Sequence, residues 1–237
     1  MGKAVKIEVI EEVWRELGKC EACGIRDLVL FADLNEDDFK LIHQPIVDLH
    51  FKPFQTLYRS EDSPDFVYTI RSGLVKLVSY SSDGRYRIVR LLGKGDLVGI
   101  EVLAGLPYAH CAEALEPLDV CRIPVSEVLR INRDTPRLHQ QMLARWQKIS
   151  SDADYWITEL STGQARQRVI HLLLHLASIS DSDDFFLPSR EDMGAMLAIT
   201  TETASRMISA LRSEKVLRVE DKNRASADLE QMRALLT

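Results

Sequence analysis

Glycine and proline interrupt the chain at short intervals between Phe51 and Ile123, and this spacing leaves room only for short strands. The runs between them are apolar and β-like, and they include FVYTIRSG, LVKLVSYSSDG, RYRIVRLLGKGD, LVGIEVLAG and LDVCRIP. Short strands separated by turn residues are typical of antiparallel rolls and barrels. Ser82-Asp83-Gly84 predicts a hairpin turn, because glycine tolerates a positive φ. We therefore expect an antiparallel β-roll over this part of the chain.

A helical pattern follows from Pro136 to Leu160, and proline suits the first turn of such a helix. Apolar residues recur there at alternating intervals of four and three, which is the repeat of a coiled-coil seam: Met142, Trp146, Ile149, Ala153, Trp156 and Leu160. The residues between these positions are strongly polar. A stripe this narrow favours a helix that pairs with its copy in a dimer. A helix that lies on its own domain is the alternative.

The last third of the chain has the pattern of a separate helical unit. We expect a helix over residues 164–179, an acidic loop over 181–184, and two short helices over 190–197 and 201–212. The run VLRVEDKN then predicts a small hairpin, and LEQMRALL predicts a final helix.

The two short helices are predicted to meet at a tight turn. Ser189 and Thr200 suit the N-caps of the first and second helix. Gly194 leaves room for a second helix to cross closely. The expected buried residues lie at helical spacing: Met193, Leu197, Ala204, Met207, Ile208 and Leu211. Two short helices joined in this way form a helix-turn-helix.

The second short helix is predicted to expose a set of polar side chains on the face opposite its apolar residues. The predicted DNA contacts on and before this face are Thr200, Thr201, Glu202, Ser205, Arg206 and Ser209. In a major groove, arginine can bond both acceptors of guanine, glutamate can accept from the amino group of cytosine, and serine can bond a base edge or a phosphate. An ordinary surface ion pair between Glu202 and Arg206 is the alternative.

The overall charge argues against binding through a bulk positive field, because the formal net charge is −6. Basic and acidic residues balance between Arg166 and Arg224, so binding to DNA would depend on a few well-placed cations. No apolar stretch is long enough to span a bilayer, and the N-terminal residues do not have the pattern of a secretory signal. We expect a cytoplasmic protein with no membrane partner.

The order of these elements resembles the Crp/Fnr family of bacterial transcription regulators, and its Fnr branch in particular. The stretches that carry the resemblance are IRSGLVK (70–76), GDLVGIE (95–101), EALEPLDVCRIP (113–124), HQQM (139–142) and ITTETASRM (199–207). The Glu-x-x-Ser-Arg pattern of that branch is present as Glu202, Ser205 and Arg206. The resemblance implies a homodimer that reads two TTGAT-like half-sites about one helical turn apart. It also implies that the exposed turn from Ser81 to Arg85 contacts RNA polymerase. Ala198 departs from the glycine that relatives often place in the turn.

The resulting expectation is an α+β fold with four parts. Residues 1–34 form an N-terminal segment with a Cys-x-x-Cys motif, and residues 35–135 form a cyclic-nucleotide-binding-like β-roll. Residues 136–161 form a dimerisation helix, and residues 162–237 form a winged helix-turn-helix domain. We find no phosphate-binding glycine loop, metalloprotease motif or nucleophile elbow, so we do not expect an enzyme.

The cysteines are the candidate sensor residues. The Fnr branch holds a 4Fe–4S cluster through Cys-x-x-Cys-x5-Cys and a further cysteine in the roll. Cys20, Cys23 and Cys121 match this pattern, but the remaining position is Val29, which cannot bind iron. Cys111 is one substitute, and its alternative is a small buried apolar residue. Asp27, Asp33 or an external thiol are further candidates for the fourth ligand.

Three other signals are alternatives to a cluster. Cyclic AMP is disfavoured because no lysine or arginine lies between Asp96 and Cys121, where a phosphate would need one. Cys20 and Cys23 could instead cycle between dithiol and disulfide. Haem bound through His110 or His43 is the third option. Because the predicted seam carries no charge, we expect the protein to dimerise without a ligand, so that the signal acts on DNA affinity or on polymerase contact.

Overall fold

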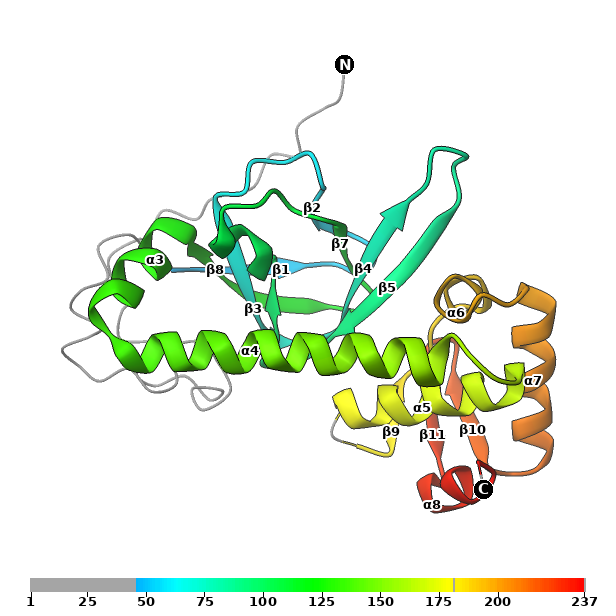
Figure 1. The fold of residues 1–237 in the computed structure, drawn as a ribbon. Helices are drawn as coiled ribbons and strands as arrows, with labels where there is room; N and C mark the ends of the chain where they lie inside the picture. The colour runs from blue at the N-terminus through cyan, green and yellow to red at the C-terminus, as the bar shows by residue number, and fades with distance from the viewer. Residues whose placement is uncertain (1–45, 181, 237) are drawn as a thin grey trace.

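The computed structural model describes residues 46–180 and 182–236, and it shows an α+β fold in which a β-roll and a C-terminal unit lie along one long helix (Figure 1). Val29, Cys20, Cys23 and His43 lie outside the described residues. The expected fold class is confirmed.

The roll consists of two four-stranded antiparallel sheets. The first has the strand order β1 (Val47–Phe51), β8 (Leu118–Pro124), β3 (Phe66–Ser72) and β6 (Leu97–Val98). The second has the order β2 (Thr56–Tyr58), β7 (Cys111–Ala114), β4 (Val75–Tyr80) and β5 (Tyr86–Leu92). Inward residues of both sheets, such as Ile70, Val75 and Val120, are fully buried in one core.

The hairpin between β4 and β5 turns where the sequence predicts it. Gly84 has φ 80°, and the backbone amide of Ser81 donates to the carbonyl of Arg85 at 2.9 Å. The two strands extend beyond the body of the roll, and their turn points away from the long helix (Figure 1).

One strand prediction in the roll is wrong in part. Only the first two residues of LVGIEVLAG form a strand, and Ile100–Ala104 form a 3-10 helix, η2. Gly99 and Gly105 at its two ends have φ values of 78° and 75°, so the backbone turns left-handed at both ends and the strand stops. A Cβ at Gly99 would also lie 2.8 Å from the ring of Tyr108.

The long helix begins and ends where its sequence pattern indicates. A short helix, α3 (Val125–Asp134), leads from the roll to α4 (Pro136–Tyr155), and α4 continues into one π-helical segment, η3 (Trp156–Leu160). Pro136 occupies the first turn of α4 as predicted.

The predicted dimer seam is wrong at its C-terminal end. Leu160 is fully buried and Trp156 is 9% exposed, and both belong to a core that this chain forms by itself. Met142 and Ile149 pack partly against the core of the roll. Trp156 and Leu160 therefore follow the alternative, in which the helix lies on its own domains, whereas Met142 and Ile149 stay partly exposed and their place in the seam remains a prediction. The large apolar side chains that α4 and η3 leave exposed are Leu143, Trp146 and Ile157.

The C-terminal unit contains the elements expected of a winged helix-turn-helix. These are α5 (Ala165–Ser180), β9 (Asp184–Phe186), α6 (Arg190–Leu197), α7 (Thr201–Ser213), β10 (Leu217–Asp221), β11 (Arg224–Ala227) and α8 (Leu229–Ala234). Its small antiparallel sheet has the order β10-β11-β9. Among the described residues, no helix combines the length and hydropathy needed to cross a membrane.

Candidate nucleic-acid interface

Helix α6 starts with a side-chain N-cap. The Ser189 hydroxyl accepts a hydrogen bond from the backbone amide of Asp192 at 3.0 Å, and it donates to the Asp192 carboxylate at 3.1 Å. Acidic residues in the first turn also suit the positive end of the helix dipole. The predicted N-cap is therefore confirmed, and it fixes where the first helix of the pair begins.

The turn between α6 and α7 depends on two small residues. Ala198 adopts the left-handed conformation with φ 53° and ψ 46°. Gly194 lies against the turn, because a Cβ at this position would be 2.7 Å from the carbonyl oxygen of Ile199. The close crossing expected at Gly194 is confirmed. A residue with a Cβ is strained in this conformation, so the presence of alanine instead of glycine at 198 destabilises the turn.

Helix α7 has a capped start and a buried inner face. The hydroxyl of Thr200 accepts a hydrogen bond from the backbone amide of Thr203 at 3.2 Å. Ala204, Ile208 and Leu211 are buried in the core of the unit, as the apolar spacing predicts. The outer face is thereby directed away from the core.

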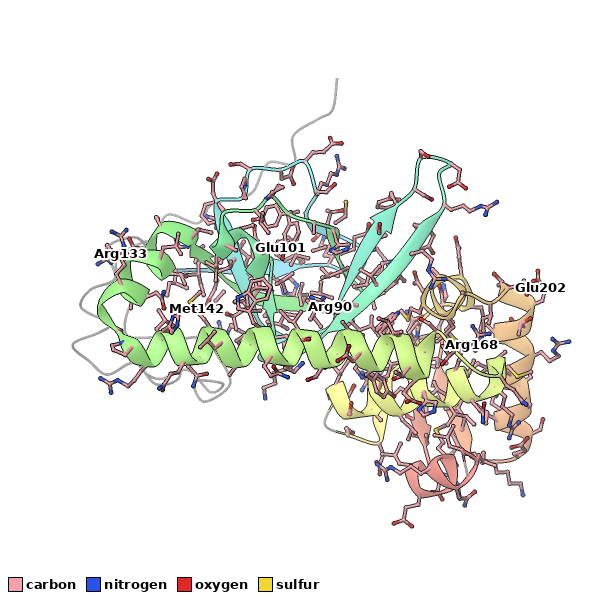
Figure 2. The ribbon with its side chains drawn as sticks, viewed as in Figure 1. Arg90, Glu101, Arg133, Met142, Arg168 and Glu202 are labelled. Atoms are coloured by element: carbon pink, nitrogen blue, oxygen red, sulfur yellow. The ribbon has the colours of Figure 1, made fainter. Side chains whose placement is uncertain are left out.

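The polar residues predicted to contact DNA share this outer face. Thr200, Thr201, Glu202, Arg206 and Ser209 are exposed, and Ser205 is partly exposed. Figure 2 shows Glu202 at the outer side of the C-terminal unit, away from the roll.

The charged groups on this face are available for contacts outside the chain. Within the described part of the chain, no ion pair joins Glu202 to Arg206, and no hydrogen bond engages the Arg206 guanidinium. A hydrogen bond from its own backbone amide lowers the pKa of Glu202, and the Thr200 hydroxyl adds to this effect. The carboxylate therefore stays ionised as an acceptor.

Two arginines that sequence reasoning missed support the turn. The Arg168 side chain on α5 donates to the carbonyl of Leu197 at 2.6 Å, and Arg87 on β5 donates to the carbonyl of Met196 at 3.4 Å. Both cations lie at the negative end of α6, where the last carbonyls of a helix lack partners inside it. No local pattern in the sequence links these residues to the turn, because the contacts join segments far apart in the chain.

The two described cysteines lie in different surroundings. The Cys121 thiol on β8 is partly exposed and donates a hydrogen bond to the Asp48 carboxylate of β1 at 3.4 Å. Cys111 on β7 belongs to the second sheet, is also partly exposed, and packs against the apolar cluster that the roll shares with the C-terminal unit. The described part of the chain has no group of three or more histidine, cysteine or acidic side chains arranged to hold a metal ion. Both interpretations of Cys111, as a substitute ligand and as a small buried apolar residue, stay predictions.

The interior of the roll is lined by tyrosine rings. Tyr58 stacks on Tyr108 with ring centroids 3.8 Å apart and on Tyr68 at 5.8 Å. The Tyr58 hydroxyl is buried without a hydrogen-bond partner in the described residues, and burial raises its pKa well above the usual value. The Glu101 carboxylate accepts a hydrogen bond from the amide of Ala109 at 3.0 Å.

One cation near this interior lies outside the segment from Asp96 to Cys121, in which the sequence has no lysine or arginine. Arg90 on β5 is close enough to affect the pKa of two groups: it opposes the effect of burial on Tyr58 and adds to it on His110. Figure 2 shows Arg90 and Glu101 in the same part of the roll. Sequence reasoning missed Arg90 because it searched only the chain from Asp96 to Cys121.

Comparison with known proteins matches both the roll and the C-terminal unit. A family described as "Cyclic nucleotide-binding domain" matches residues 48–134, and one described as "Crp-like helix-turn-helix domain" matches residues 167–235. The "Anaerobic regulatory protein" of Haemophilus influenzae is 30% identical over 213 residues, which cover 86% of this chain and 82% of that relative. The chain belongs to the Crp/Fnr family.

Further relatives and solved structures agree with this assignment. The "Fumarate and nitrate reduction regulatory protein" of Vibrio cholerae is 28% identical over 86% of this chain and 84% of its own length. FixK2 from Bradyrhizobium japonicum has the same fold with a TM-score of 0.73 at 22% identity, covering 81% of this chain and 98% of FixK2. The transcriptional regulator TTHB099 from Thermus thermophilus has a TM-score of 0.68 at 22% identity, covering 79% and 96%. The expected family, with its Fnr-like branch, is confirmed.

Membership in the Crp/Fnr family makes this protein a DNA-binding transcription regulator and not an enzyme. The outer face of α7 is therefore the candidate interface with DNA.

Replacing Ala198 by glycine is expected to stabilise the helix-turn-helix. The substitution removes about 1–2 kcal/mol of left-handed strain and costs about 0.5–1 kcal/mol in added freedom of the unfolded chain. We expect the free energy of unfolding to rise by about 0.5 kcal/mol in denaturant titrations. Ala195→Gly, inside α6 with right-handed geometry, is the matched control and should lower it by about 0.5–1 kcal/mol. A decrease for both variants would contradict the role assigned to the turn.

Proposed function

We propose that this protein is a cytoplasmic homodimeric regulator that reads TTGAT-like half-sites through α7 and responds to oxygen or redox state. The observation that carries the proposal is the outer face of α7, where Glu202 and Arg206 lie one turn apart and neither is paired with the other. A surface ion pair, the alternative explanation for these two residues, would engage both groups within the chain.

Each residue on this face has a distinct task in the proposal. Arg206 donates to the two acceptors of a guanine, and Glu202 accepts from the amino group of a cytosine. Ser205, Ser209, Thr200 and Thr201 bond base edges or phosphates. The Thr200 hydroxyl also caps α7. In the proposal it contacts DNA through the hydrogen-bonding capacity that the cap does not use.

The second subunit is expected to pack on the exposed stripe of α4 and η3. Leu143 is 56% exposed and Ile157 is 62% exposed, with Trp146 and Ala153 between them at helical spacing. This stripe keeps two members of the seam predicted from sequence and replaces those that face the protein's own core. Its apolar character supports dimerisation without a bound ligand.

The proposed signal acts through cysteines, three of which match the Fnr pattern. Cys121 supplies one accessible thiol, while Cys20 and Cys23 lie outside the described residues. A 4Fe–4S cluster bound to these three cysteines would supply sensitivity to oxygen. The chain contributes the thiolates, and the Asp48 carboxylate lies beside Cys121, 3.4 Å from its sulfur.

The exposed turn from Ser81 to Arg85 is the proposed contact with RNA polymerase. It carries both charges, since the Arg85 side chain pairs with Asp83 at 3.2 Å, and it extends from the body of the roll (Figure 1).

Arg206→Ala is expected to remove the preference for one base in the half-site. The loss of a bidentate contact should cost about 1–3 kcal/mol on the preferred duplex and much less on random DNA. Fluorescence anisotropy with duplexes that vary in the half-site measures this difference. Arg212→Ala, an exposed arginine on another side of α7, is the control and should affect all duplexes equally. Equal loss on random DNA for Arg206→Ala would mean that this residue contacts only phosphates.

Leu143→Glu is expected to convert the dimer to a monomer, because a carboxylate would be buried in the seam without a partner. Sedimentation velocity at micromolar concentration measures the oligomeric state. Leu106→Glu is a matched control, since Leu106 is 55% exposed and Leu143 is 56% exposed, but Leu106 lies on a loop of the roll. Leu106→Glu should remain a dimer. A wild-type monomer, or a dimeric Leu143→Glu variant, would exclude the proposed seam.

Anaerobic purification is expected to yield a coloured protein that contains iron and sulfide. Cys121→Ser should lose most of both, whereas Cys111→Ser should retain them, because Cys111 packs among apolar residues. Iron and sulfide assays and the visible spectrum before and after exposure to air provide the measurements. Iron-free wild-type protein would contradict the cluster and favour a thiol switch at Cys20 and Cys23.

A further inference from the structure

The β4–β5 hairpin of the roll contacts α6 of the helix-turn-helix near both of its ends. Strand β4 provides Lys76 near the N-terminal end of α6, and strand β5 provides Arg87 near the C-terminal end. Figure 1 shows α6 beside β5, on the side of the C-terminal unit that faces the roll. The first helix of the DNA-binding pair is thus fixed by the sensor domain.

The contact at the N-terminal end is a buried ion pair between the two parts of the chain. Lys76 Nζ lies 2.9 Å from Asp192 Oδ1 on α6 and 3.5 Å from Glu113 Oε2 on β7. Lys76 is 7% exposed and Asp192 is 6% exposed. The Tyr86 hydroxyl donates to the same Asp192 oxygen at 3.4 Å, and its ring lies 5.7 Å from the lysine nitrogen.

Apolar packing and a second cation complete the contact. Ile88 of β5 is buried in the same cluster as Met193 and Met196 of α6. The Arg87 hydrogen bond to the Met196 carbonyl lies at the other end of α6. Gly93, which follows β5, lies so close to α5 that a Cβ there would be 2.1 Å from Ile179 Cγ2.

Buried ion pairs contribute less to stability than to the choice of one geometry. Their desolvation cost offsets most of the attraction, and the attraction is recovered only when the partners meet with good geometry. Apolar contacts in the same interface are not directional and would tolerate small rotations. Lys76 and Arg87 therefore supply what the apolar contacts lack, a fixed angle of α6 relative to the roll.

The geometry points to the β4–β5 hairpin as a lever that sets the angle of the helix-turn-helix, with Lys76 as its positioning residue. Because α6 packs directly on α7, the angle of α6 determines where Arg206 points. In a dimer, the same angle determines the distance between the two reading helices, and hence the half-site spacing that the protein accepts. Any change in the roll that moves this hairpin would therefore change DNA affinity. This inference rests on the proposed function.

Lys76→Met is expected to relax the preference for half-site spacing. We expect affinity for a palindrome with the preferred spacing to fall about tenfold, within the usual range of coupling between sites. Affinity for palindromes lengthened or shortened by one base pair should change much less. Anisotropy titrations on the three duplexes give the ratio of affinity at the preferred spacing to affinity at the altered spacings. Lys94→Met removes the same charge from an exposed position of the roll and should leave the ratio unchanged.

Two further measurements keep the test decisive. Arg87→Met changes an exposed residue, so it should fold even if Lys76→Met does not, and it should lower the ratio in the same direction. Hydrogen exchange of the free protein should rise in α6 and α7 of Lys76→Met but not in β3 and β8. Equal loss of affinity at all spacings, or unchanged exchange in α6, would overturn the lever. A wild-type protein with no preference for the palindrome would instead refute the proposed function, and hydrogen exchange would still test the lever.

Discussion

One buried apolar cluster joins the roll, the long helix and the C-terminal unit, and the direction of the reading face depends on it. The cluster includes Leu74 and Ile88 of the roll, Leu160 at the end of the long helix, and Phe185 and Ile208 of the C-terminal unit. Because apolar burial has no preferred direction, the cluster holds these parts together without fixing their angle. The contacts of Lys76 and Arg87 with the two ends of α6 fix that angle, and both residues belong to the sensor domain.

The same chemistry separates the residues that build the interface with DNA from those that read it. The Ser189 side chain caps α6, and the small residues Gly194 and Ala198 allow the turn. Arg168 and Arg87 bond carbonyls of α6 and so are not free to read bases. Within the described residues, Arg206 makes no such contact, and Glu202 is bonded only by its own amide and the Thr200 hydroxyl, so both charges remain available for the proposed contacts with DNA. The role of a polar residue in this unit therefore follows from its hydrogen-bond partners and not from its residue type.

Local sequence predicted most of the helices, because their signals are local. Pro136 at the start of α4 and Ser189 at the start of α6 act within one turn of the chain. The prediction was wrong for LVGIEVLAG, where glycines with positive φ ended the strand, and for the C-terminal end of the seam. Periodicity identifies an apolar stripe, but it cannot tell which neighbour covers the stripe. Trp156 and Leu160 belong to the chain's own core, while Ile157, one position from Trp156, remains exposed.

The sequence by itself determined the family and the α+β architecture, and it supplied the residues proposed to read DNA, since each depends on motifs and spacings contained in short segments. The tertiary structure alone decided which side of the long helix stays free, where Arg90 lies in the roll, and that Lys76 meets Asp192. The physical reason is that these contacts join residues far apart in the chain. Their partners are chosen by how the domains pack, and no local pattern in the sequence encodes that choice.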